Sequence, residues 1–139
     1  MKAIKQFVIQ RLLGDSQILS LLGGRNVFAA QRDMIPETFP AIVVFDVGGK
    51  HRSIPHDARD ALLQVSIMTT TSMFDADTIY ERVTSILNTP IDSTARFLLD
   101  STSNQAYWIR EDSVRDLADP TRNLYHKALT FRAWGRTTK

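Results

Sequence analysis

Cysteine is absent from the sequence, which excludes disulfide bonds, thiolate nucleophiles and cysteine-ligated zinc together. Long apolar runs are absent too: the longest, residues 41–45, is far shorter than the roughly 20 residues that a membrane-spanning helix needs. Charges and amides interrupt the apolar residues of the segment 1–11, which therefore lacks the continuous apolar stretch of a signal peptide. We expect a soluble, intracellular protein that has no membrane partner and is stabilised by packing.

A surplus of one charge sign is also lacking. The 17 lysines and arginines nearly balance the 15 acidic residues, and a formal net charge of +2 does not indicate a nucleic-acid-binding protein. Apolar residues (43%) and charged residues (23%) occur at the frequencies of ordinary folded proteins, so neither disorder nor a fibrous architecture is expected. The 139 residues suit one domain over residues 1–139, because a single core is commonest at about 100 to 150 residues.

Catalytic motifs are missing as well. The sequence has no Gly-x-Ser-x-Gly turn for a serine nucleophile, and its two Gly-Gly pairs lack the pattern of phosphate-binding loops. His51, His56 and Asp57 are residue types that bind metals, but metal ligands need rigid elements around them, and we interpret this segment as a solvated, charged loop. We expect no enzyme, no metal and no cofactor, and a hydrolase built on these residues is the least favoured alternative.

Apolar side chains at three- and four-residue spacing predict two helical regions. The first helix covers residues 4–13 and leads into a short helical turn capped by Asp15 or Ser16. The second covers residues 76–87, with Asp75 as its cap. Its opposite face is polar, so this helix is expected to lie on a sheet with one side only.

Four segments have the composition and alternation of strands. Residues 41–47 are rich in β-branched side chains and suit a central strand, and residues 63–68 alternate between apolar and polar. The polar residues 48–60 between them indicate a loop that is long for a hairpin. Residues 107–114 and 124–134 predict a second hairpin.

The order of these elements predicts an α+β fold, an antiparallel four-stranded sheet with two helices packed on one face. A fifth strand is added if residues 26–30 pair with the sheet. Residues 91–105 are interpreted as irregular structure with a short helix. On the expected register, the face away from the helices carries Gln64, Ser66, Met68, Trp108, Arg110 and Trp134. This mixture is too apolar for a surface without a partner.

A basic, aromatic sheet face has a second interpretation, because such a face binds single-stranded nucleic acid by stacking and phosphate contact. Arg110 and Arg132 lie near Trp108 and Trp134 in the sequence, but acidic residues such as Glu111 interleave with them. A solvated arginine edge over buried aromatics explains the same pattern, so both interpretations stay open.

The features with a recognisable order span nearly the whole chain. They are the N-terminal helix, the turn 15–24 leading into residues 25–28, the proline-flanked entry 36–45 into a strand, the alternating strand 63–68, the helix 76–87 and the final hairpin. In this layout the chain resembles the tail-terminator, or tail-completion, proteins of long-tailed bacteriophages.

The resemblance implies a hexameric ring that caps the tail tube, ends tube polymerisation and joins the tail to the head connector. It also implies location in the tail or neck of the virion, with assembly in the host cytoplasm, and a lumen through which DNA passes without specific binding. Another head-to-tail connector or neck component is the nearest alternative. Together with the expected open face and long loop, this suggests contacts to neighbouring subunits or the tail-tube protein through Lys50, His51, Arg52, Ile54, His56, Asp57, Arg59, Met68, Trp108, Arg110 and Trp134.

Overall fold

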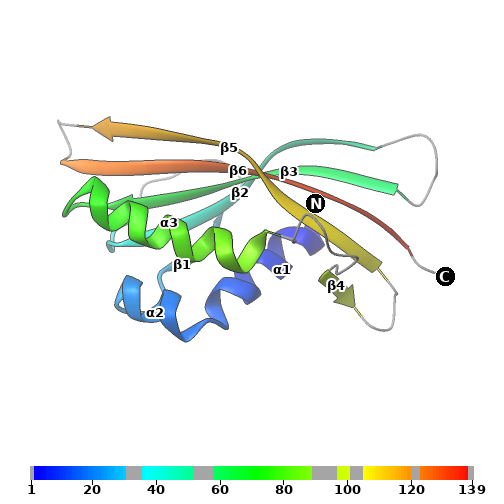
Figure 1. Cartoon of the computed structure of the whole chain (residues 1–139), viewed down its shortest axis with the longest axis horizontal. Helices are drawn as coiled ribbons and strands as arrows, with labels where there is room; N and C mark the ends of the chain where they lie inside the picture. Colours follow the sequence, from blue (N-terminus) through cyan, green and yellow to red (C-terminus); the bar gives the residue numbers. More distant parts are fainter. Residues whose placement is uncertain are drawn as a thin grey trace.

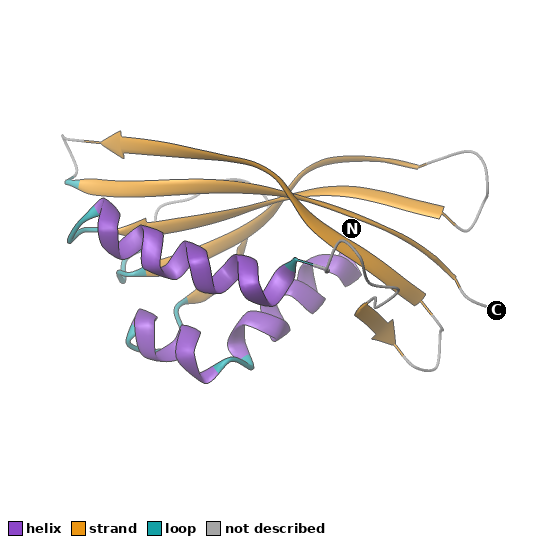
Figure 2. Ribbon diagram, viewed as in Figure 1, coloured by secondary structure: helices purple, strands orange, loops and turns teal. Residues whose placement is uncertain are grey.

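The computed structural model describes residues 2–30, 36–51, 58–88, 97–100, 105–119 and 123–137. In chain order the elements are α1 (Lys2–Leu13), α2 (Ser16–Leu22), β1 (Val27–Ala30), β2 (Ala41–His51), β3 (Ala58–Thr69), α3 (Met73–Leu87), β4 (Phe97–Asp100), β5 (Gln105–Asp119) and β6 (Leu124–Thr137). The helices lie on one side of a long, twisted sheet (Figures 1 and 2). The predicted α+β class is confirmed. Within the described part, no helix is long and apolar enough to cross a bilayer.

The described strands form one six-stranded sheet in the order β1-β2-β3-β6-β5-β4. β1 and β2 run parallel, and the other neighbours are antiparallel. The prediction of a purely antiparallel sheet with four or five strands is therefore wrong. A parallel pair cannot be joined by a two-residue hairpin turn, and ten positions, 31–40, separate β1 from β2 in the sequence. The sixth strand, β4, lies where irregular structure with a short helix was predicted.

The two hairpins are longer than predicted. β2 continues to His51 and β3 starts at Ala58, so the predicted loop over residues 48–60 is mostly paired strand. Its glycines follow a β-bulge between Asp46 and Gly48, a position at which glycine occurs within strands. The β2–β3 hairpin and the β5–β6 hairpin point to opposite ends of the sheet (Figure 1).

The hydrophobic core lies between the helices and one face of the sheet. Alternate residues of the central strands contribute to it, as expected for period-two side-chain placement. The helix residues buried there are Val8, Leu12, Ile18, Leu22, Ala76, Ile79, Val83 and Leu87, and the strand residues are Val27, Ile42, Val44, Leu63, Val65, Ile67, Ile109, Leu129, Phe131 and Ala133. The alternation predicted for residues 63–68 places Leu63, Val65 and Ile67 in this core.

Capping residues fix where the helices begin. Asp15 caps α2, because its Oδ1 accepts a hydrogen bond of 2.9 Å from the backbone N–H of Ile18. α3 is capped by Ser72, whose Oγ accepts from the N–H of Asp75 at 3.1 Å. The prediction that Asp75 is the cap is therefore wrong by three positions, and the Asp75 carboxylate instead lies in the positively polarised first turn.

Candidate interaction surfaces

Three predicted contact residues lie together on the β2–β3 hairpin. The backbone register pairs His51 with Arg59, and Lys50 with Asp60. Arg52, Ile54, His56 and Asp57 lie outside the described residues. The part of the predicted surface that is described here is thus the outer half of a paired hairpin, and not a loop.

Three more predicted contact residues lie on the β5–β6 pair. Trp108 is directly opposite Trp134, and Arg110 is directly opposite Arg132. Two arginines at facing positions repel each other unless an acid lies nearby. The Asp112 carboxylate, 4.0 Å from Arg132 Nε, offsets part of that repulsion. The sheet thus brings these residues together, with mixed rather than purely basic charge.

Met68 does not belong to an exposed surface. Its side chain is 1% exposed, and its neighbour Ser66 is fully buried, although both lie on the sheet face away from the helix-covered core. Val43 and Ala128, which flank Ser66 in the register, are also buried. The centre of this face is therefore buried within the single chain, and Met68 offers almost no surface to a partner there.

The sheet leaves two stretches of strand edge without a described neighbour. β4 pairs only with residues 105–107 of β5, and the backbone N–H of Glu111 donates to Asn88 Oδ1 at 2.7 Å. No described strand lies beside β5 after its bulge, and we call residues 113–119 the β5 edge. Likewise, β1 pairs only with residues 42–45 of β2, and we call residues 46–51 the β2 edge. The two edges lie at opposite ends of the molecule (Figure 1).

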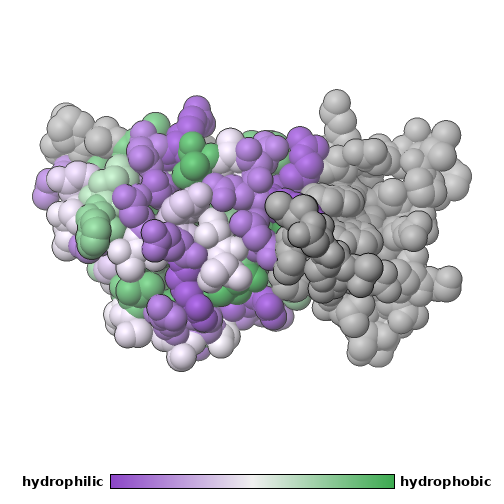
Figure 3. Space-filling view, in the orientation of Figure 1, coloured by the Kyte–Doolittle hydropathy of each residue, from purple (hydrophilic) through white to green (hydrophobic). Residues whose placement is uncertain are grey.

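Exposed apolar side chains concentrate on these two edges. Among the described residues, four large hydrophobic side chains are exposed: Val47 (49%), Phe74 (76%), Val114 (38%) and Leu117 (43%). Three of them belong to the β2 edge or the β5 edge. Over the helices, by contrast, hydrophobic residues are scattered among hydrophilic ones (Figure 3). Sequence reasoning missed Leu117 because the predicted strand ended at residue 114, and residues 114–117 have no apolar–polar alternation that would extend it.

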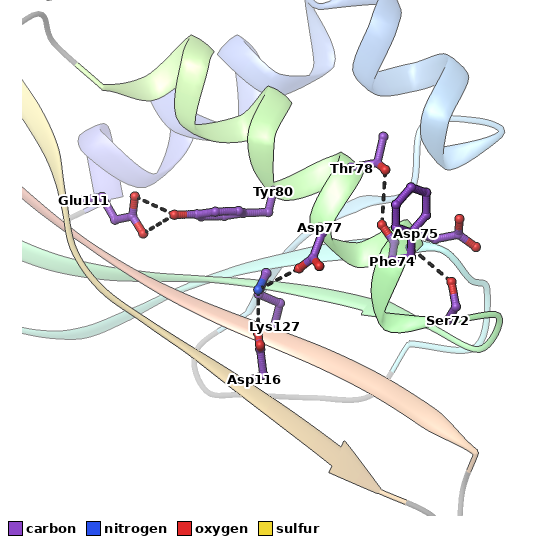
Figure 4. A network of polar contacts seen from close by, with 9 residues as sticks. All are labelled: Ser72, Phe74, Asp75, Asp77, Thr78, Tyr80, Glu111, Asp116 and Lys127. Carbon is purple, nitrogen blue, oxygen red and sulfur yellow. Dashed lines mark hydrogen bonds and ion pairs between the residues drawn. The ribbon is translucent and has the colours of Figure 1, made fainter.

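A buried ammonium joins α3 to the β5–β6 hairpin. The side chain of Lys127 is only 8% exposed, and its Nζ lies 2.5 Å from Asp116 Oδ1 and 2.8 Å from Asp77 Oδ1 (Figure 4). It also lies 5.0 Å from the ring centroid of Tyr80. Burial alone lowers the pKa of Lys127, but the hydrogen bonds that its ammonium donates to Asp116 and Asp77 outweigh burial and raise that pKa above its ordinary value.

Tyr80 makes the second link of the same helix to β5. Its hydroxyl donates to both carboxylate oxygens of Glu111, at 2.7 and 3.0 Å (Figure 4). Burial, and then the hydrogen bond to this carboxylate, raise the pKa of Tyr80 to about 12. Both contacts tie α3 to the β5–β6 hairpin, through the Tyr80 hydroxyl and the Lys127 ammonium.

A hollow of about 330 Å³ lies between the first two helices and α3, lined by Arg11, Gly14, Asp15, Arg82, Ser85 and Ile86. Across it, Arg82 holds Asp15 with hydrogen bonds of 2.6 and 3.3 Å, and this contact keeps the pKa of Asp15 below its usual value. The pair locks the α2 cap to α3. In the part of the chain that the structure covers, no group of three or more potential metal ligands is present.

No protein-family model matches the sequence, and no curated protein sequence matches it. The structure is similar to a solved chain described as "Virion of native gene transfer agent (GTA) particle", with a TM-score of 0.67. The two chains are 16% identical, and the match covers 93% of this chain and 91% of the other. The likeness therefore extends over the whole fold.

Proposed function

We propose that this chain is a structural protein of a phage-like virion, in which copies of it form a ring at the end of the tail tube. The ring ends tube polymerisation and joins the tail to the head connector. The observation that carries this proposal is the likeness in fold to a virion chain over 93% of this chain and 91% of that one. The resemblance of the sequence layout to tail terminators supports the same role.

Ring formation fits the surfaces that the chain leaves exposed. A head-to-tail ring needs two different contact surfaces on each subunit. The β2 edge and the β5 edge are different in sequence, lie far apart, and carry three of the four exposed large hydrophobic side chains among the described residues. A net charge of +2 also fits a lumen that DNA passes through, because many unpaired cations would hold phosphate tightly.

Light scattering over a range of concentrations, with negative-stain electron microscopy, tests the proposal directly. We expect six-fold rings, either alone at high concentration or after addition of the tail-tube protein of the same particle. Added before tube polymerisation, the protein is expected to shorten the tubes and to be seen at one end of each. A protein that stays monomeric and leaves tube length unchanged would overturn the proposal.

Two further measurements separate the alternatives. Rings that bind the head connector and leave the tube unaffected would place the chain elsewhere in the neck. A mobility-shift assay with single-stranded DNA at low salt tests the nucleic-acid interpretation, because phosphate contacts are strongest there. We expect no shift; a shift that Trp108→Ala abolishes would support stacking on the β5–β6 pair instead.

A further inference from the structure

Two strand edges that have no neighbour among the described residues pose a structural problem for an isolated chain. The backbone N–H and C=O groups of an unpaired edge are open to another strand, and natural proteins usually protect such edges with charged residues (lysine above all), proline, a β-bulge or a covering element. The β5 edge carries charges at Arg115, Asp116 and Asp119 but neither lysine nor proline, and it exposes Val114 and Leu117. The β2 edge carries one lysine, Lys50, and exposes Val47, the extra residue of a β-bulge.

The directions of the strands make the two edges complementary. β2 is antiparallel to β3, β3 to β6, and β6 to β5, so β2 and β5 run in opposite directions within the sheet. If the sheet continues from one copy into the next with its orientation kept, the β5 of one copy meets the β2 of the next in antiparallel fashion. Antiparallel pairing is the slightly more stable arrangement per residue.

We propose that the β5 edge of one copy pairs with the β2 edge of a neighbouring copy, so that one sheet runs through successive subunits. This inference rests on the proposed function and specifies the contact that closes the ring. The edges are seven and six residues long by their numbers, 113–119 and 46–51, which matches the about five to six residues of an ordinary strand. Because the edges lie at opposite ends of the molecule, neighbouring copies are staggered along the strands, as tilted strands in closed barrels are.

Head-to-tail pairing gives both edges of every copy a neighbour, whereas a symmetric dimer pairs only one edge of each copy. Two β5 edges paired around a two-fold axis would cover Val114 and Leu117 and leave Val47 exposed. Head-to-tail pairing covers all three. Phe74, which is also exposed, lies in the first turn of α3 and belongs to neither edge, so it provides a control position.

Cysteine cross-linking tests the pairing, because the chain has no cysteine of its own. Val47→Cys is combined in turn with Ser113→Cys, Val114→Cys, Arg115→Cys and Leu117→Cys on a second, separately purified copy. Mixtures are oxidised at high protein concentration, and dimers are counted by denaturing electrophoresis. At least one of these pairs must bring the two Cα atoms within the roughly 4.4 to 6.8 Å that a disulfide spans.

We expect cross-linking at least about tenfold faster than in a Val47→Cys and Phe74→Cys mixture, because a contact raises the effective thiol concentration to the mM range. The double variant Val47→Cys/Leu117→Cys is expected to give ladders up to ring size. Rates that equal the Phe74 control for every pair would overturn the inference. So would a Leu117→Cys variant that cross-links with itself faster than with Val47→Cys, because this is the signature of the symmetric dimer.

Electron microscopy of the same samples keeps this inference separate from the proposed function. Rings without faster cross-linking would mean that the ring closes through other surfaces, and the inference fails while the function stands. Cross-linked ladders from a protein that never caps or shortens tubes would mean that the edge pairing is correct and the proposed function fails.

Discussion

The helix-covered face of the sheet and its two edges carry the same kinds of apolar side chain, but these side chains are buried on the face and exposed at the edges. Leu63, Val65 and Phe131 are 0–1% exposed beneath the helices, whereas Val114 and Leu117, on a strand of the same sheet, are 38% and 43% exposed. The difference lies in what stands beside each strand, not in the residue types. The helices bury one face of the sheet, whereas no described strand lies beside the β5 edge or the β2 edge.

Truncation of a core side chain tests the first half of this comparison and has the largest expected effect. Phe131→Ala removes the largest side chain of the core that is almost fully buried, and it should lower the free energy of unfolding by about 3–5 kcal/mol. Val114→Ala, on the β5 edge, is the matched control and should change it by less than about 0.5 kcal/mol. Urea denaturation followed by circular dichroism measures both. Equal losses would show that the edge is as tightly packed as the core.

The Lys127 contacts test whether the β5–β6 hairpin depends on α3. Asp77→Asn combined with Asp116→Asn leaves a buried ammonium without its carboxylates, and we expect the free energy of unfolding to fall by about 2–3 kcal/mol. This is less than the range for a buried ion pair, because both carboxylates are about half exposed. Lys127→Met replaces the cation with an apolar side chain of similar size and should cost much less. If the methionine variant proves the less stable of the two, charge pairing and not burial dominates this site.

Tyr80 makes the stability of the same region depend on alkaline pH. The pKa of its hydroxyl is about 12 in the folded chain and about 10 in the unfolded chain, so the unfolded state loses its proton first. The contribution of Tyr80 to the free energy of unfolding is complete below about pH 10 and is lost as pH rises from about 10 to 12. The expected change is about 1–2 kcal/mol after allowance for partial exposure. The raised pKa of Lys127 acts in the same direction.

Denaturant midpoints at pH 8, 10 and 11 measure this dependence. Tyr80→Phe is the control, because it keeps the ring over Lys127 and removes the ionisable hydroxyl. Its stability should fall less steeply with pH than that of the parent chain. Parallel curves for the two proteins would remove Tyr80 as a source of the pH dependence.

Local patterns in the sequence were sufficient for the elements that fold against the core. The stripe of residues 76–87 predicts α3, and the alternation of Leu63, Val65 and Ile67 predicts which face of β3 is buried, because both patterns repeat at the period of the backbone. Asp15 was one of two predicted caps and is the one observed. These features depend on neighbours a few residues away.

Features that depend on distant partners were not predicted. Gly48 and Gly49 were predicted to lie in a loop because glycine is depleted in strands, yet they are part of β2 and pair with β3. Ser66 and Met68 read as an exposed face because their alternation is the same whether or not something covers them. Lys127 meets Asp77 and Asp116, one on a helix and one on a strand, and no spacing rule links the three. These three errors concern tertiary burial or pairing, whereas the misplaced cap at Asp75 is a local one.

The smallest expected effect on stability is the sharpest test of the free edges. Leu117→Lys places on the β5 edge the residue that edge strands use against pairing, and it should change the free energy of unfolding by less than about 0.5 kcal/mol because the position is already 43% exposed. Ring formation, measured by light scattering, should nevertheless be lost. Phe74→Lys removes a still more exposed side chain away from both edges and should leave assembly unchanged. A protein that assembles equally well with either substitution would show that apolar exposure on the β5 edge has no part in joining the copies.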